Sequence, residues 1–165
     1  MIENFLFQDL SNLQILDLTS NLMEAIPEDS FNGLSNLHTL KLTSNNVERI
    51  GAASLRGMTT LHTLDLGHNQ LTSIHSEAMT NLTLLKDLIL FNNSLETIPD
   101  AVRPLTSLIT IDVGLNGIKN IDEGVFATLS GLIGLKLAEN FLRVVEVETF
   151  ARLPNLQILN LVGNM

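Results

Sequence analysis

Residues 61–74 read LHTLDLGHNQLTSI, and this stretch decides the fold. Its apolar and asparagine positions are Leu61, Leu64, Leu66, Asn69, Leu71 and Ile74. That spacing fits neither the 3.6-residue period of a helix nor the sustained alternation of an ordinary strand. The alternation around Leu64 and Leu66 predicts a very short strand. The residues after it predict a turn that returns the chain to the same core.

The same pattern recurs along the whole chain. Copies begin at residues 13, 37, 61, 85, 108, 132 and 156, an interval of 24 residues except for one 23-residue unit. Self-similarity at a fixed period is the signature of a solenoid, in which each repeat packs only on its neighbours. We therefore predict one domain over residues 1–165. It comprises a half repeat at 2–12, full repeats at 13–36, 37–60, 61–84, 85–107, 108–131 and 132–155, and a partial repeat at 156–165.

An asparagine occupies the same place in every copy. The column contains Asn21, Asn45, Asn69, Asn93, Asn116, Asn140 and Asn164. The turn after each strand would bury unpaired backbone groups, and an asparagine amide offers both donors and an acceptor to pair them. We expect this asparagine ladder to be structural, with each member serving its own turn and the next repeat.

The pattern L-x-x-L-x-L-x-x-N-x-L matches the leucine-rich repeat, so residues 2–165 resemble leucine-rich repeat proteins. The 24-residue period, the Phe residues late in the repeats and the Ile-Pro pairs at 26–27 and 98–99 resemble the typical class. That class builds the ectodomains of Toll-like receptors and of Slit-like and chaoptin-like extracellular proteins. The resemblance implies an α/β-type solenoid, a horseshoe with a short parallel β-sheet on its concave face. Loops, turns or short 3-10 helices would form the convex face.

A second apolar set in the later half of each repeat is expected to complete the core. Its members are Phe31, Leu34, Leu55, Met58, Met79, Leu82, Phe126, Leu129, Phe150 and Leu153. In the half repeat, Ile2, Phe7 and Leu10 fall on core columns. The convex half of the unit at 85–107 has no Phe and is one residue short, so we expect a local change of curvature there.

The chain begins and ends within a repeat, and neither a polar cap nor a signal peptide is visible. We interpret it as the middle of a longer protein, the alternative being a short natural solenoid. Open ends predict self-association. No apolar run reaches the roughly 18 residues that a membrane span needs.

The outward positions of the strands form the candidate ligand-binding face. Its middle column is Asp17, Lys41, Asp65, Ile89, Asp112, Lys136 and Asn160. Opposite charges on adjacent strands lie close enough to pair. Two interpretations stay open: a mildly stabilising charge ladder, or charges that receive those of a ligand.

Apolar residues gather in the C-terminal half of the same face. Phe91 and Leu115 stand in two columns that begin polar, with Thr19-Ser20, Thr43-Ser44 and Gly67-His68. We expect the two residues on neighbouring strands, roughly 5 Å apart. Ile89, Ile109, Ile133 and Phe141 extend this patch. Contiguous exposed apolar surface often marks a partner site. The alternatives are a covering loop, or a Phe141 that folds into the core.

Catalytic and metal chemistry are not indicated. His38 and His62 share a column but lack a nearby carboxylate, which makes a poor metal site, and we expect neither metal nor cofactor. The chain has no Cys, no Ser-His-Asp constellation on one face and no phosphate-binding glycine loop, so an enzyme is not expected. The net charge of −9 argues against nucleic acid as a partner.

The sequence thus predicts a non-catalytic binding module for a protein ligand or co-receptor. The resemblance favours the central part of an extracellular or cell-surface receptor, and sequons make Asn81 and Asn92 glycosylation candidates. The alternative is a cytoplasmic leucine-rich repeat scaffold that docks a partner protein, which the absence of Cys would favour.

Overall fold

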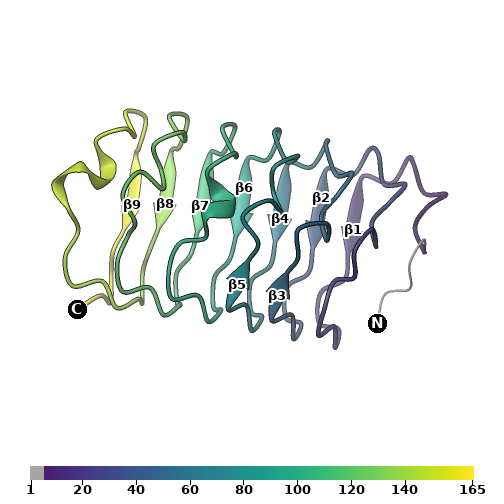
Figure 1. Ribbon diagram of the computed structural model, residues 1–165, viewed down its shortest axis with the longest axis horizontal. Helices are drawn as coiled ribbons and strands as arrows, with labels where there is room; N and C mark the ends of the chain where they lie inside the picture. Colours follow the sequence, from purple (N-terminus) through teal and green to yellow (C-terminus); the bar gives the residue numbers. More distant parts are fainter. Residues whose placement is uncertain (1–5) are drawn as a thin grey trace.

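The computed structural model describes residues 6–165 as a solenoid of stacked coils, so Ile2 lies outside the described residues. One short strand from each coil joins a parallel sheet in the order β1-β2-β4-β6-β7-β8-β9 (Figure 1). The strands are β1 (Ile15–Asp17), β2 (Thr39–Lys41), β4 (Thr63–Asp65), β6 (Asp87–Ile89), β7 (Thr110–Asp112), β8 (Gly134–Lys136) and β9 (Ile158–Asn160). The predicted leucine-rich repeat horseshoe is confirmed.

The strand register repeats the sequence register residue for residue. Leu16 lies beside Leu40, Leu40 beside Leu64, and so on to Leu159. Because alternate side chains of a strand face opposite sides, the central residue points inward and its two neighbours point outward. Leu40 and Leu64 are wholly buried, whereas Leu159 in the last coil is exposed, since no further described coil covers it.

A second, two-stranded parallel sheet was not predicted from the sequence. Its strands are β3 (Arg49–Ile50) and β5 (Ser73–Ile74), which pair Ile50 with Ile74. Both follow a ladder asparagine by four and five residues, where the extended chain returns toward the convex side. The repeat pattern indicated an apolar residue here but carried no signal for the ladder hydrogen bonds between coils.

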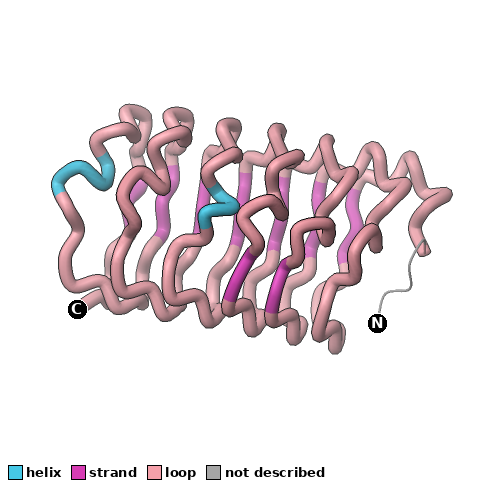
Figure 2. Tube along the Cα trace, viewed as in Figure 1, coloured by secondary structure: helices cyan, strands magenta, loops and turns pink. Residues whose placement is uncertain are grey.

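The convex side is made of turns and two short 3-10 helices, η1 (Asp100–Val102) and η2 (Val147–Phe150) (Figure 2). The predicted convex apolar set is buried, apart from half-buried Phe150. In the unit at 85–107, whose convex half has no Phe, Ala101, Val102 and Leu105 are wholly buried and fill that part of the core. Helix η1 therefore lets a shorter coil keep a filled core.

The asparagine ladder pairs the backbone groups of the turns as expected, but each side chain also reaches the preceding coil rather than the next one. The Asn69 amide donates to Leu66 O at 3.1 Å in its own coil and to Leu42 O at 2.9 Å in the preceding coil, and its oxygen accepts from Val47 N at 3.0 Å. The prediction that each asparagine serves the next repeat is therefore wrong in direction. The coils stagger so that each side chain reaches back. Among residues 6–165 no buried side-chain nitrogen or oxygen lacks a partner.

The half repeat at the N-terminal end follows its predicted columns only in part. Phe7 is buried and stacks on Phe31 with 6.2 Å between ring centroids. Leu10 is 46% exposed, so the expectation that it lies in the core is wrong. It occupies the equivalent position to Leu34, but no described coil covers its other side.

Replacing Gly33 by Ala is expected to detach this half repeat. Gly33 has φ +96°, and a Cβ there would lie 2.3 Å from the Gln8 carbonyl oxygen, which is closer than atoms can approach. Strain and clash together should cost about 2 kcal/mol or more. Thermal melts should show a lower midpoint, and hydrogen exchange should quicken at residues 7–13.

Gly57→Ala is the matched control, because Gly57 also has a positive φ, +85°, yet its Cβ would meet only Asn32 Oδ1 at 3.6 Å. It should cost only about 1 kcal/mol, the backbone part alone. Equal losses for the two variants would show that the Gly33 contact with Gln8 is not what holds the half repeat.

Candidate ligand-binding face

The outward side of the seven-stranded sheet carries the predicted middle column in full register. Asp17 lies beside Lys41, Ile89 beside Asp112, and Asp112 beside Lys136. Two ion pairs form, Lys41–Asp17 at 3.4 Å and Lys136–Asp112 at 3.3 Å. Both lysines turn toward the preceding coil, and Asp65 forms no ion pair within the described part of the chain.

The acidic members of the column also have a structural role that the sequence did not reveal. The Oδ1 atoms of Asp17, Asp65 and Asp112 each accept the backbone N–H two residues later, at 3.0, 2.9 and 3.0 Å. Such bonds fix the turn after the strand. Hydrogen bonds from Thr19 lower the pKa of Asp17 below its usual value, and Lys41 lowers it further. One oxygen of each carboxylate thus serves the fold. The second oxygen of Asp17 and of Asp112 pairs with a lysine, whereas that of Asp65 forms no ion pair among the described residues.

Ile89 and Phe91 form an apolar ridge between two glycines. A Cβ on Gly67 would lie 3.5 Å from Ile89 Cγ2, and one on Gly114 would lie 3.1 Å from Phe91 Cδ2. The Phe91 ring therefore rests on the bare backbone of the following coil. A larger side chain at position 114 would displace the ring, so the position of the Phe91 ring depends on a glycine at 114. Both apolar side chains are half-buried.

His68 contacts the Phe91 ring, and Asn92 in turn contacts His68. The His68 and Phe91 rings meet edge to face with centroids 5.4 Å apart. Asn92 Nδ2 lies 2.8 Å from His68 Nδ1, so the amide and the imidazole are hydrogen-bonded. Phe91 is thus held from two sides in an outward orientation.

Leu115 is close to Phe91 but not directly opposite it. Extending the register that pairs Ile89 with Asp112 places Gly114 opposite Phe91 and Asn92 opposite Leu115. The expectation that Phe91 and Leu115 lie on neighbouring strands is therefore wrong in detail. Both follow their strands, and they are offset by one residue. Leu115 is 39% exposed and has φ +53°, a left-handed conformation that a bulky side chain rarely adopts.

The remaining predicted members of the patch lie on its two borders. Ile109 and Ile133 are half-buried and precede the strands β7 and β8. Phe141 is 45% exposed, so the alternative that it folds into the core is wrong. It follows ladder residue Asn140 and therefore stands at the edge of the solenoid rather than on the sheet.

The histidine pair packs as rings. His38 and His62 lie edge to face with centroids 5.1 Å apart, and His62 Nδ1 donates to Thr60 O at 2.7 Å. No group of three or more metal-binding side chains occurs among the described residues. The geometry is that of an aromatic contact on the rim of the sheet.

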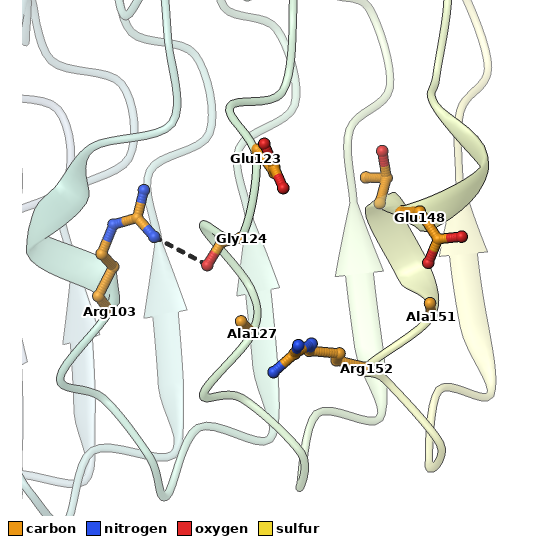
Figure 3. Close-up of a pocket in the computed structure, with 8 residues that line it drawn as sticks. Arg103, Glu123, Gly124, Ala127, Glu148, Ala151 and Arg152 are labelled. Atoms are coloured by element: carbon orange, nitrogen blue, oxygen red, sulfur yellow. Dashed lines mark hydrogen bonds between the residues drawn. The ribbon is translucent and has the colours of Figure 1, made fainter.

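A hollow of about 420 Å³ lies on the convex side, near η1 and η2 (Figure 3). Its lining includes Arg103, Glu123, Glu148 and Arg152. The Arg103 guanidinium is already engaged, with Asp100 Oδ1 at 2.6 Å and with Gly124 O at 2.8 Å. The first bond lies within the η1 coil, and the second ties that coil to the next one, so the Arg103 guanidinium has a structural role.

The chain belongs to the leucine-rich repeat proteins. A family model described as a BspA type leucine rich repeat region matches residues 1–133, and one described as a leucine rich repeat matches residues 106–165. This repeat is a non-catalytic protein-interaction fold. No helix among the described residues is long and apolar enough to cross a membrane.

Solved structures agree with this assignment. The structure of a TLR13–ssRNA13 complex aligns with a TM-score of 0.93 at 29% identity, over 99% of this chain and 23% of that one. The Leptospira interrogans leucine-rich repeat protein LIC12759 aligns with a TM-score of 0.85 at 30% identity, over 96% of this chain and 39% of that one. The APL1 leucine-rich repeat domain shares the fold, with a TM-score of 0.88 at 23% identity. The alignment covers 98% of this chain and 42% of that one. No curated protein sequence matches.

Proposed function

We propose that this chain is a non-catalytic recognition module that binds a protein ligand or co-receptor through the concave face. We further propose that it forms the central part of an extracellular or cell-surface receptor. The observation that carries the first proposal is Phe91, an aromatic side chain held outward between Gly114 and His68. The repeat does not require it, since the equivalent residues in the two neighbouring coils are glycines, Gly67 and Gly114.

The conformation of Leu115 supports the same surface. A leucine in the left-handed region costs conformational energy that a glycine there would avoid. The structural reason for an αL residue after each strand is the turn, yet other coils fill this place with small or polar residues such as Ser20, Ser44 and Asn92. An exposed apolar side chain at this position suits a contact with a partner.

The charges around the ridge indicate what the partner would present. Ile89 lies between Asp65 and Asp112 in the column, and Asp65 forms no ion pair in the described part of the chain. A partner with an apolar anchor flanked by a basic side chain would match this arrangement. Buried apolar anchors supply most of the binding energy at such interfaces, and rim charges supply specificity.

Protein is the better supported ligand class. The TLR13 structure contains single-stranded RNA, but this chain carries a net charge of −9 and its sheet face displays acidic side chains beside Ile89. Nucleic acid binding depends on neutralising phosphates with Lys and Arg. An acidic face would instead repel the phosphate backbone of a nucleic acid.

A cytoplasmic scaffold is the alternative, and glycosylation separates the two. If the chain is secreted, we expect a glycan on Asn81 and none on Asn92. Asn81 is exposed in a convex turn, whereas Asn92 is half-buried and its amide is bonded to His68 at 2.8 Å. Mass spectrometry of the chain secreted from eukaryotic cells checks this, with Asn81→Gln abolishing the mass increase.

A glycan on Asn92 would occupy the ridge and would contradict the concave-face proposal. A chain that carries a signal peptide yet stays unglycosylated at Asn81 would remove the glycan as support for an extracellular role. The self-association predicted for the open ends stays a prediction.

A further inference from the structure

After each ladder asparagine the chain runs extended along one edge of the solenoid. Residues one and three positions after the asparagine point outward, and the residue between them, such as Met23 or Val47, is buried. Backbone hydrogen bonds join the coils along this edge, for example Thr72 N to Glu48 O at 2.9 Å. We call the outward set the lateral strip. It comprises Leu22, Glu24, Asn46, Glu48, Gln70, Thr72, Ser94, Glu96, Gly117, Lys119, Phe141 and Arg143.

The charges of the lateral strip reverse along its length. From the first full repeat to the last, the charged column reads Glu24, Glu48, Thr72, Glu96, Lys119, Arg143. All six side chains are exposed. The N-terminal half is therefore acidic and the C-terminal end is basic, although the chain as a whole is acidic with a net charge of −9.

Apolar groups stand at both ends of the strip. Leu22 is 84% exposed at one end, and Phe141 is 45% exposed at the other. A hollow of about 410 Å³ beside Phe141 is lined by Lys119, Phe141, Arg143 and Met165. The middle of the strip carries polar or small residues, Asn46, Gln70, Ser94 and Gly117.

We propose that the lateral strip is an interface for a second copy of this chain, bound antiparallel in a closed two-fold dimer. A two-fold axis between Thr72 and Glu96 sets the first full repeat of one copy against the last full repeat of the other. Glu24 then faces Arg143, Glu48 faces Lys119, and each pair occurs twice. The spacing of coils is the same in both copies, so the register holds along the strip. Leu22 of each copy enters the hollow beside Phe141 of the other.

The groups that this dimer needs are available. Glu24, Glu48 and Arg143 form no ion pair within residues 6–165, and Arg49, the basic neighbour of Glu48, does not pair with it. Lys119 pairs with Glu96 at 3.1 Å, but both side chains are more than half exposed. An exposed pair of this kind contributes little, so Lys119 can exchange partners at small cost. The concave face is left open on both copies.

Charge reversal tests the dimer. Sedimentation velocity of the 165-residue chain over about 1–100 µM should show association that stops at two copies. Glu24→Arg alone, and Arg143→Glu alone, should each weaken the dimer by about tenfold or more, because each places two like-charged pairs across the axis. The double variant, Glu24→Arg with Arg143→Glu, should restore wild-type affinity. Glu28→Arg makes the same change in charge as Glu24→Arg at an exposed position on the convex side, and it should leave the dimer affinity unchanged.

Three results would overturn the proposal. The wild-type chain could remain monomeric throughout this range. The double variant could associate as weakly as the single ones. Association could also grow beyond two copies and ignore both single changes, which would point to contact through the ends of the solenoid. All three substituted side chains are exposed, so each variant is expected to fold. Circular dichroism melts of each variant check this.

Discussion

Replacing Asn69 by Ala should lower the free energy of unfolding by about 2–4 kcal/mol. The change removes the acceptor for Val47 N and the donor for Leu42 O and Leu66 O. Leu42 and Leu66 are wholly buried, so water cannot easily replace these bonds. Because coils stack on one another, the defect weakens the contact between two coils as well as one turn. Urea denaturation followed by circular dichroism measures the loss.

Asn21 provides a control of the same residue type in the same column. It is exposed, and among residues 6–165 its amide donates to Leu18 O at 2.8 Å and to Thr19 O at 3.2 Å, both in its own coil. Asn21→Ala should cost less than about 1 kcal/mol. Asn46→Ala, one residue beyond a ladder position, should also do little. If Asn69→Ala costs no more than these two, the ladder is not the stabilising element.

The double change Phe91→Ser with Leu115→Ser should weaken binding of the protein partner by at least about 100-fold. It removes the two outward apolar side chains that we propose as anchors for the partner. Some stability is lost as well, about 1–2 kcal/mol, because the Phe91 ring packs on Gly114 and His68. Binding is measured by surface plasmon resonance well below the melting temperature of the variant, so that unfolding does not account for the loss.

The control for this pair must lie on the convex side and leave the fold intact. Asp29 is unsuitable, because its φ is +58° and it pairs with Arg56 at 3.4 Å. Glu28→Ser with Glu123→Ser is the better choice, since both side chains are exposed and neither forms an ion pair in the described structure. Affinity equal to wild type is expected. A convex pair that reduces binding as much as the concave pair would move the site to the other face.

Much of the scaffold could be predicted because its physics repeats. A column such as Leu40 and Leu64 is fixed by the alternation of a strand and by stacking, so a period in the sequence becomes a register in space. The asparagine column was equally readable, since each buried turn needs the same donors and acceptors. The sequence did not indicate which neighbouring coil each asparagine amide bonds to, because the stagger between coils decides this.

Other features depended on contacts that no period encodes. The short sheet of β3 and β5 arises from hydrogen bonds between coils. Asp65 and Asp112 bond the N–H two residues later, a role that a charge pattern alone does not indicate. The support of Phe91 by Gly114 also joins residues from different coils. The sequence showed that Phe91 departs from its column. It did not show that Gly114 and His68 support the ring.

Site-directed photo-cross-linking tests most directly whether the concave face binds the partner. The chain has no Cys, so one cysteine introduced by Ala138→Cys, beside the ridge, or by Ser76→Cys, on the convex side, can carry a benzophenone label. We expect one partner protein to be cross-linked from position 138 and not from position 76, and the cross-link to disappear when Phe91→Ser and Leu115→Ser are added. The same partner must bind the unlabelled chain in a direct assay. Cross-linking from position 76 alone, or from position 138 regardless of Phe91 and Leu115, would contradict recognition through the concave face.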